Sequence, residues 1–301
     1  VNNDALTQAG GSLNTADLTN NGIVTLSDIA SMTAAEIDNR GRFYHTGGTV
    51  EIGSTLENHG IYTYTGGTFN GHLHLHQGGT AELGNSFTAG DGITNDTQMT
   101  IGSSQVITAN GQGFINNSSL RLQGVLTGSG QQVNNGSFTV SGGELTGTGG
   151  FVNKGIFDQA SDLSIGNTGG FDNQAIYRMG HGTALTLGSA AVTFSNTSSF
   201  TMDDSLILGS GAFVNRNGGT LKGSGIINTS FTNEGRLLVE GSTGINTGFT
   251  NSGVIELGHA SAQLFGGSIH NTGTIQGHGQ VANAITNSGM IEAVSGFITA
   301  S

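Results

Sequence analysis

The sequence predicts an all-β fold, a right-handed parallel β-helix of about 16 rungs, from three observations. A phrase built around Asn recurs about every 19 residues along the whole chain. Apolar and polar residues alternate within each copy, as they do in a short strand with one buried face. Glycine recurs at fixed offsets after the Asn, where the chain must turn. A fixed period of this length is typical of solenoids, in which each repeat forms one rung.

The repeated phrase reads LTNNGIVTL from Leu18, FVNKGIFDQ from Phe151 and FTNSGVIEL from Phe249. Neighbouring rungs lie about 4.8 Å apart, so each anchor amide can donate to the next one and to backbone groups at the corner. Because an unpaired buried amide costs about 1–3 kcal/mol, we predict a continuous Asn/Gln ladder. Its members are Asn2, Asn20, Asn39, Asn58, Gln77, Asn95, Asn116, Asn134, Asn153, Asn173, Asn196, Asn215, Asn233, Asn251, Asn271 and Asn287.

The positions two residues before and four residues after the anchor are apolar in almost every copy, and the residue that follows the second of them is mostly polar. This alternation predicts one short strand on each side of the corner, with its apolar side chains in the core. In the copy anchored at Gln77, the apolar residue before the anchor is Leu75. Phenylalanine fills this position in consecutive copies, which predicts an aromatic stack of Phe151, Phe171, Phe194, Phe213, Phe231 and Phe249.

Glycine follows the anchor by two residues in most copies, for example as Gly22, Gly41 and Gly253. We expect these glycines to supply a positive φ at a tight corner. A second corner follows, marked by pairs such as Gly47-Gly48. Because no stretch falls outside the repeat, we expect residues 1–301 to form a single β-helix with no separate capping domain. Right-handedness follows from the strong preference of strand–connection–parallel strand units for that hand.

Composition excludes several classes of function. The chain has no Cys, so it forms neither a disulfide framework nor a thiolate metal site. Only 8 Lys+Arg stand against 20 Asp+Glu, for a formal charge of −12, which argues against nucleic acid as a partner. No apolar run approaches the ~20 residues of a transmembrane helix. The chain begins with Val1 and has no signal-like segment, so we expect a mature product or an excised segment that is soluble.

The 19-residue period, the Asn-x-Gly corner, the lack of Cys and the shortage of Lys and Arg carry a resemblance over the whole chain. The sequence resembles the filamentous-haemagglutinin-like and autotransporter-like secreted β-helix exoproteins of bacteria. The resemblance implies a protein that crosses the outer membrane unfolded and serves as a cell-surface shaft, adhesin or biofilm scaffold. The Asn-Pro motifs of that family's amino-terminal secretion domain are absent, because the chain has no Pro. That domain lies outside this segment, or secretion takes another route.

One local motif suggests chemistry. In His72-Leu73-His74-Leu75-His76, alternation places His72, His74 and His76 on the outer face of one strand, and the predicted register puts His76 next to Glu57. Such a set could hold zinc or copper. However, side chains that are neighbours on the outer face of a strand diverge, which favours a solvated strand face. We therefore predict no metal and no other cofactor, and keep these histidines as the candidate ligands.

Enzymatic β-helices gather acidic residues, usually with a cation, on one outer face. The best acidic groups here are Asp203-Asp204, Asp158 with Asp162, and Glu234 with Glu240. They are sparse, and we read them as solubilising charges, so no catalytic residue is predicted.

Two functions remain open at this stage. The first is a non-enzymatic, extracellular structural protein that stacks head to tail on copies of itself, or that forms the shaft of a surface adhesin bound to other surface or matrix components. No cap is apparent at either end, and stacking of unlike ends makes an open filament. The second is a β-helix that binds or degrades carbohydrate. We expect a bacterial protein, outside the cell or on its surface.

Overall fold

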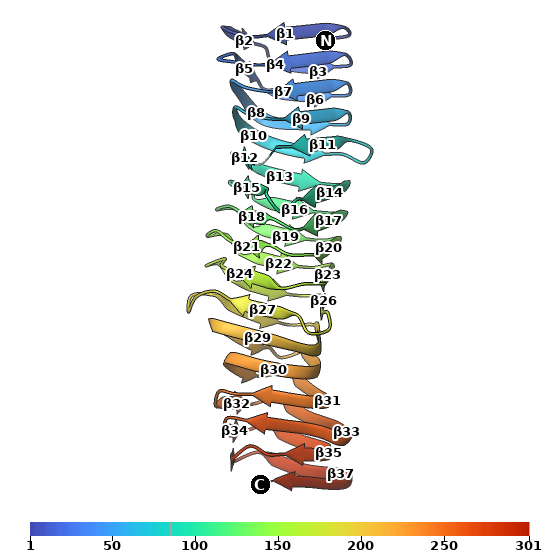
Figure 1. The fold of residues 1–301 in the computed structure, drawn as a ribbon, viewed down its shortest axis with the longest axis vertical. Coiled ribbons are helices and arrows are strands. Elements are labelled where there is room, and N and C mark those ends of the chain that lie inside the picture. Colours follow the sequence, from blue (N-terminus) through green and yellow to red (C-terminus); the bar gives the residue numbers. More distant parts are fainter. Residues whose placement is uncertain (85, 301) are drawn as a thin grey trace. The chain divides into compact units, whose positions relative to one another are not determined.

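The computed structural model describes residues 1–84 and 86–300, and every regular element within them is a β-strand (Figure 1). The chain divides into two compact units. Unit 1 comprises Val1–Phe138 with Thr146–Gly149, and unit 2 comprises Thr139–Leu145 with Gly150–Ser301. In each unit, successive turns of the chain pair in parallel, about 19 residues apart in sequence. The prediction of a parallel β-solenoid is confirmed.

The strands of unit 1 fall into three columns. The first column follows the Asn corner and contains β1 (Ala5–Gln8), β4 (Ile23–Leu26), β7 (Arg42–His45), β9 (Ile61–Tyr64), β11 (Thr80–Leu83), β14 (Gln98–Ile101) and β17 (Ser119–Leu122). The second contains β2 (Ser12–Asn14), β5 (Ser31–Ala34), β12 (Ser86–Ala89), β15 (Val106–Ala109) and β18 (Val125–Thr127). The third ends at the anchor residues and contains β3 (Asp17–Asn20), β6 (Glu36–Asn39), β13 (Gly92–Asn95), β16 (Phe114–Asn116) and β19 (Gln132–Asn134). Two longer strands, β8 (Thr49–Asn58) and β10 (Thr68–Leu75), run through the second and third columns.

Unit 2 repeats this plan with longer strands. Its first rungs use short strands: β21 (Glu144–Leu145), β22 (Phe151–Asn153), β23 (Ile156–Gln159), β24 (Leu163–Ile165), β25 (Phe171–Asn173), β26 (Ile176–Met179), β27 (Ala184–Leu187) and β28 (Thr193–Asn196). Later strands turn corners without a break: β29 (Ser199–Asn215), β30 (Thr220–Asn233), β31 (Arg236–Ile245), β33 (Val254–Gly266), β35 (Thr274–Val281) and β37 (Met290–Ala300). Short strands complete the third column: β32 (Phe249–Asn251), β34 (Ile269–Asn271) and β36 (Ile285–Asn287). Strand β20 (Ser137–Val140) spans the boundary between the units.

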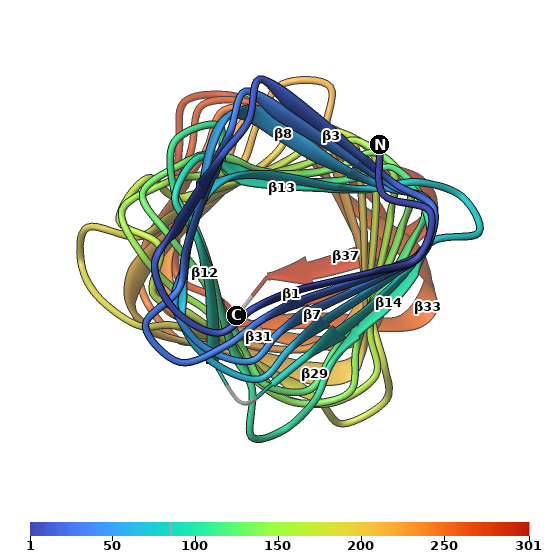
Figure 2. The same cartoon turned by 90° about the horizontal axis from the view of Figure 1, so that it is seen from above.

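The three columns of unit 1 enclose its core. In Figure 2, β3 and β13 lie along one side, β12 along a second, and β1, β7 and β14 along the third. Alternate side chains of each strand point inward, as in β6, where Ile37 is fully buried between the more exposed Glu36 and Asp38. The third-column residues Ile37, Leu56, Leu73 and Ile93 are register partners in consecutive rungs, and none has exposed surface. The period-2 pattern in the sequence is therefore the pattern of burial.

The predicted Asn ladder is present in unit 1. The side-chain Nδ2 of one Asn donates to the Oδ1 of the Asn in the next rung over 2.7–2.8 Å, from Asn2 through Asn58 and again from Asn95 through Asn134. The second Nδ2 hydrogen reaches a backbone carbonyl at the corner of that next rung, as from Asn20 to Arg42 at 3.0 Å. The amides are fully buried in Asn20 and Asn39, and these paired contacts remove the cost of burying them.

The ladder is interrupted where the sequence placed Gln77, so that prediction was wrong by two residues. Leu75 aligns with both Asn58 and Asn95, and Gln77 is exposed. The cause is a wider corner. Two residues lie between Asn58 and Ile61, the start of β9, whereas four lie between Leu75 and Thr80, the start of β11. The sequence prediction placed the anchor at a fixed distance before the strand that follows the corner, so the two extra residues shifted it to Gln77. Leu73, and not Leu75, is the apolar residue two positions before the anchor position of this rung.

In unit 2 the same ladder runs without interruption. Its Nδ2–Oδ1 distances are 2.6–2.9 Å through Asn153, Asn173, Asn196, Asn215, Asn233, Asn251, Asn271 and Asn287. The corner contact also recurs, for example from Asn215 to the carbonyl oxygen of Arg236 at 3.0 Å. Each rung is thereby held to the next by side-chain amides as well as by the backbone.

The Phe column of unit 2 stacks as predicted over its first four members. The rings of Phe151, Phe171, Phe194 and Phe213 are nearly parallel, with successive centroids 4.6–5.0 Å apart. The two contacts that extend the column through Phe231 to Phe249 are tilted, at 6.0 and 5.3 Å. A second stack that the sequence analysis did not single out, Phe157–Tyr177–Phe200, meets the first edge to face. Stacked and edge-to-face rings are both favourable geometries, so the two columns form one aromatic core.

The corner glycines serve a purpose other than the expected positive φ. None of Gly22, Gly41 and Gly253 has a positive φ. Instead, the corners stack so closely that a Cβ at each position would lie 2.0 Å from a carbonyl oxygen of the preceding rung. Only glycine allows this approach. The positive φ belongs to the second corner, where Gly48 has φ 73°.

Substitution of Gly41 tests this explanation. We expect Gly41→Ala to lower the free energy of unfolding by about 1–3 kcal/mol, because the Cβ meets the backbone oxygen of Gly22. Gly10→Ala is the matched control, since a Cβ there meets no atom within 4 Å, and its effect should stay within about 0.5 kcal/mol. Urea unfolding of both variants measures the difference. Equal stabilities would show that the corners do not require glycine for close stacking.

Candidate functional site

The structure separates His72 from the other two candidate histidines, His74 and His76. Leu73 and Leu75 of β10 point into the core, and the imidazoles between and around them lie toward the outside. His72 is only 6% exposed, and both of its ring nitrogens have partners. Its Nδ1 lies 3.1 Å from the carbonyl oxygen of Asp91, and its Nε2 lies 2.9 Å from Thr94 Oγ1. His72 is thus part of the local packing and offers no nitrogen to a ligand.

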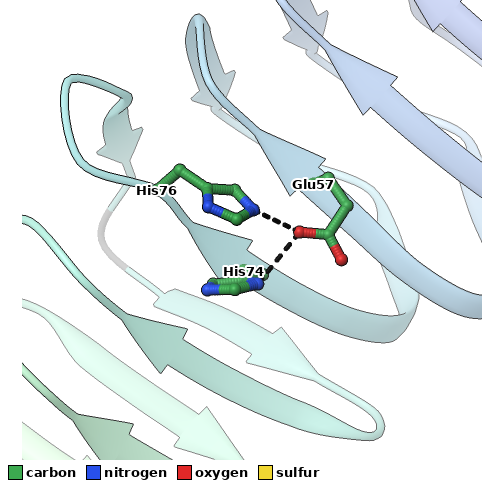
Figure 3. A group of neighbouring side chains, drawn as sticks. All are labelled: Glu57, His74 and His76. Atoms are coloured by element: carbon green, nitrogen blue, oxygen red, sulfur yellow. Dashed lines mark hydrogen bonds and ion pairs between the residues drawn. The ribbon is translucent and has the colours of Figure 1, made fainter.

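His74 and His76 instead converge on one carboxylate (Figure 3). Glu57 of β8 is the register partner of His74, and the His74 Nδ1 lies 2.9 Å from Glu57 Oε2. The Nε2 of His76 contacts the same oxygen. The three side chains are 23–27% exposed, so the group lies half-buried on the outer surface of unit 1. The cluster, defined as Glu57, His74 and His76, brings two imidazole nitrogens and one carboxylate together.

The wide corner explains this convergence. The sequence predicted that His76 lies opposite Glu57, but the register pairs Glu57 with His74, two residues earlier. The strand ends at Leu75, so His76 lies in the corner, and the centroids of the His74 and His76 rings are 3.9 Å apart. The His59 ring also stacks on the His76 ring, with their centroids 3.9 Å apart and an angle of 13° between their planes. Side chains that diverge on a straight strand can therefore meet at its end.

A second carboxylate holds His74 from the opposite side. The His74 Nε2 lies 2.8 Å from Asp96 Oδ2, in the rung that follows. Asn117 donates to the other oxygen of Asp96 at 2.7 Å. Partial burial raises the pKa of Asp96, but the hydrogen bonds from His74 and Asn117 outweigh it and leave this pKa below its ordinary value. Asp96 is therefore an anion at neutral pH, and it fixes the orientation of the His74 ring.

Unit 2 carries a looser group of similar composition. The His181 Nδ1 lies 3.5 Å from Asp203 Oδ1 and 4.0 Å from Asp204 Oδ2. The three side chains are 63–73% exposed. This group has one imidazole, longer contacts and more exposed side chains than the cluster at Glu57.

The other acidic candidates have partners in neighbouring rungs. Asp158 pairs with Arg178 at 3.2 Å, Glu234 with Arg216 at 3.2 Å, and Glu240 with Lys222 at 3.2 Å. Asp162 accepts a hydrogen bond from the backbone N–H of Ala184. The sequence predicted sparse, solubilising charges at these positions and did not predict their pairing with cations of neighbouring rungs. Each pair is surface-exposed and contributes at most about 1 kcal/mol, and its acid is engaged rather than free for proton transfer.

One buried histidine lies apart from the cluster. His45, at the end of β7, has no exposed surface, and its Nδ1 lies 3.1 Å from the hydroxyl of Tyr62. Burial lowers the pKa of His45 from 6.5 to about 4. Burial also raises the pKa of Tyr62 well above its ordinary value, so the phenol stays protonated. His45 is neutral in the folded protein over the physiological range.

Comparisons with known proteins give no relatives: no family model, no curated protein and no solved structure matches this chain. Among residues 1–84 and 86–300, no helix has the length and apolar character needed to cross a membrane. The interpretation of the site therefore depends on its own geometry.

His45 makes stability depend on pH in a defined window. The unfolded chain binds a proton at this residue near pH 6.5, and the folded protein binds it only near pH 4. Stability from this residue is therefore complete above pH 6.5 and is lost as the pH falls toward 4. We expect the free energy of unfolding to drop by about 2–3 kcal/mol more between pH 7 and 4.5 in the wild type than in His45→Met. Urea unfolding at both values measures the difference, and equal slopes in the two proteins would contradict it.

Proposed function

We propose that the chain is a non-enzymatic structural protein whose solenoid associates end to end with further solenoid rungs. The observation that carries this proposal is the identity of the columns. Amides lie over amides in both units, except at Leu75 in unit 1. Aliphatic side chains lie over one another in unit 1, and aromatic rings do so in unit 2, so most rungs offer a similar surface to the next. In a solenoid each added rung contributes its own stability and an interface with its neighbour, so the fold can be extended into a fibre or a shaft.

The outermost rungs expose groups that are covered elsewhere. In the first rung, Leu6 is partly exposed, whereas its register partner Val24 is fully buried. In the last rung of unit 2, Ile291 is 43% exposed, although its partner Ile275 is fully buried. Edge strands with apolar side chains are templates for further pairing. A second copy of the chain presents a rung of the required type at each edge.

The Asn ladder gives such stacking a direction. Wherever two anchor Asn residues are neighbours in the ladder contacts described above, the Nδ2 donates to the Oδ1 of the rung that follows. Asn287 is exposed and its Nδ2 has only the carbonyl of Gly289 as a partner among the described residues. Asn2 donates to Asn20, and no described group donates to its Oδ1. The donor of Asn287 and the acceptor of Asn2 are complementary, so head-to-tail contact extends the ladder.

The charges support a structural role. The acidic groups considered for catalysis lie in ion pairs or hydrogen bonds between adjacent rungs, which supports a role in solubility and in holding the rungs together.

The resemblance to secreted bacterial β-helix proteins suggests the setting: an extracellular fibre, or the shaft of a surface adhesin or biofilm scaffold. In the shaft, further rungs of the same polypeptide take the place of a second copy.

Electron microscopy and sedimentation of purified chain test end-to-end association. We expect unbranched fibres that sediment at increasing protein concentration. Leu6→Lys should abolish them, because it places a charge on the inner face of the edge strand. Thr7→Lys adds the same charge to an exposed position of the same strand, and it should form fibres as the wild type does.

Circular dichroism of both variants checks that the solenoid is retained. A wild-type chain that stays monomeric at every concentration would contradict self-association, and so would equal loss of fibres in the two variants.

A further inference from the structure

The cluster of Glu57, His74 and His76 has the composition of a transition-metal site. Its ligand atoms, one from each residue, lie within 4.8 Å of one another. Zinc–nitrogen bonds are about 2.0–2.1 Å, so two ligand atoms on a tetrahedral ion are about 3.3 Å apart. The 2.9 Å between His74 Nδ1 and Glu57 Oε2 needs only a small expansion to reach this value. The side chains already point toward one another from two adjacent rungs (Figure 3).

The environment of His74 is the second observation. A metal-binding His typically donates its other ring N–H to a carboxylate, which fixes the ring and strengthens the ligand. His74 directs Nδ1 into the cluster and Nε2 to Asp96 Oδ2 at 2.8 Å. Asp96 is itself held by Asn117. This supporting carboxylate lies outside the cluster and comes from a third rung.

The positions of the ring nitrogens also favour an ion. His74 lies beside a carboxylate oxygen at each nitrogen, with Nδ1 near Glu57 and Nε2 near Asp96. The Nε2 of His76 faces the same Glu57 oxygen as the His74 Nδ1 does. Two imidazole nitrogens and one carboxylate oxygen therefore meet at one point of the surface, as the ligands of one ion would.

We propose that Glu57, His74 and His76 bind one divalent transition-metal ion, with Zn²⁺ as the best match. Two imidazoles and one carboxylate suit Zn²⁺ better than Ca²⁺ or Mg²⁺, which prefer oxygen ligands throughout. The half-buried position leaves the fourth coordination site to water. Because Glu57 lies on β8 and the histidines on and after β10, the ion links two rungs at the wide corner where the Asn ladder is interrupted. The site does not depend on the proposed end-to-end association.

Calorimetric titration of the whole chain with ZnCl₂ at pH 7.5 tests the site. We expect one strongly bound Zn²⁺ per chain in the wild type, and loss of this binding in Glu57→Gln and in His74→Gln. Asp96→Asn keeps all three ligands but removes the supporting carboxylate, so binding should weaken by about 10–100-fold. His181→Gln alters the exposed group of unit 2, and it should bind as the wild type does.

Substitution by CoCl₂ gives an independent readout, because tetrahedral Co²⁺ absorbs more strongly in the visible range than hydrated Co²⁺. Far-ultraviolet circular dichroism confirms that each variant is folded. Absence of stoichiometric binding to the wild type would overturn the proposal. Unchanged binding in folded Glu57→Gln and His74→Gln would overturn it as well, and loss in His181→Gln alone would move the site to unit 2.

Discussion

The structure depends on register: each rung must place the same kind of side chain over its counterpart in the neighbouring rung. A buried amide is tolerated because the next rung supplies an acceptor, as Asn39 does for Asn20. A ring in the core is covered because the next rung supplies another ring, as Phe194 does for Phe171. The corners impose the same condition on the backbone, since Gly41 leaves room for the carbonyl of Gly22. A shift of one strand by one residue would therefore break the amide contact, the ring stacking and the glycine corner at the same time.

The interruption of this order coincides with the candidate site. Where the corner gains two residues, Leu75 replaces the amide, the strand ends, and His76 in the corner contacts Glu57. A polar ladder contact is lost at this rung, and a cluster of titratable groups lies on its outer face. Irregularities in an otherwise repetitive fold are often the places where local rules give way to a specific function.

Much of the fold was predictable because a solenoid converts sequence period directly into spatial columns. The parallel pairing, the amide ladder and the Phe column followed from aligned residues alone. Three features did not. Gln77 was misplaced because the offset was assumed constant across a corner whose length varies. The role of Gly41 lies in contact between rungs, which a single rung does not reveal. The residue types alone identified the histidines as candidate ligands. The same register error hid the contacts of His74 with Glu57 and Asp96, because it placed His76 opposite Glu57.

Cross-linking tests register most directly, because the chain has no native Cys. Thr232 and Thr250 are register partners on the outer face of adjacent rungs, so Cys at both positions should lie about 4.8 Å apart at Cα and oxidise to a disulfide. Thr232→Cys with His270→Cys is the control, because these positions lie in the same column but two rungs apart. Their Cα atoms are about 9.6 Å apart, which is beyond the reach of a disulfide. We expect complete oxidation of the first pair and none within the second. A disulfide between positions 232 and 270, or none between 232 and 250, would contradict the stacking of like residues over like.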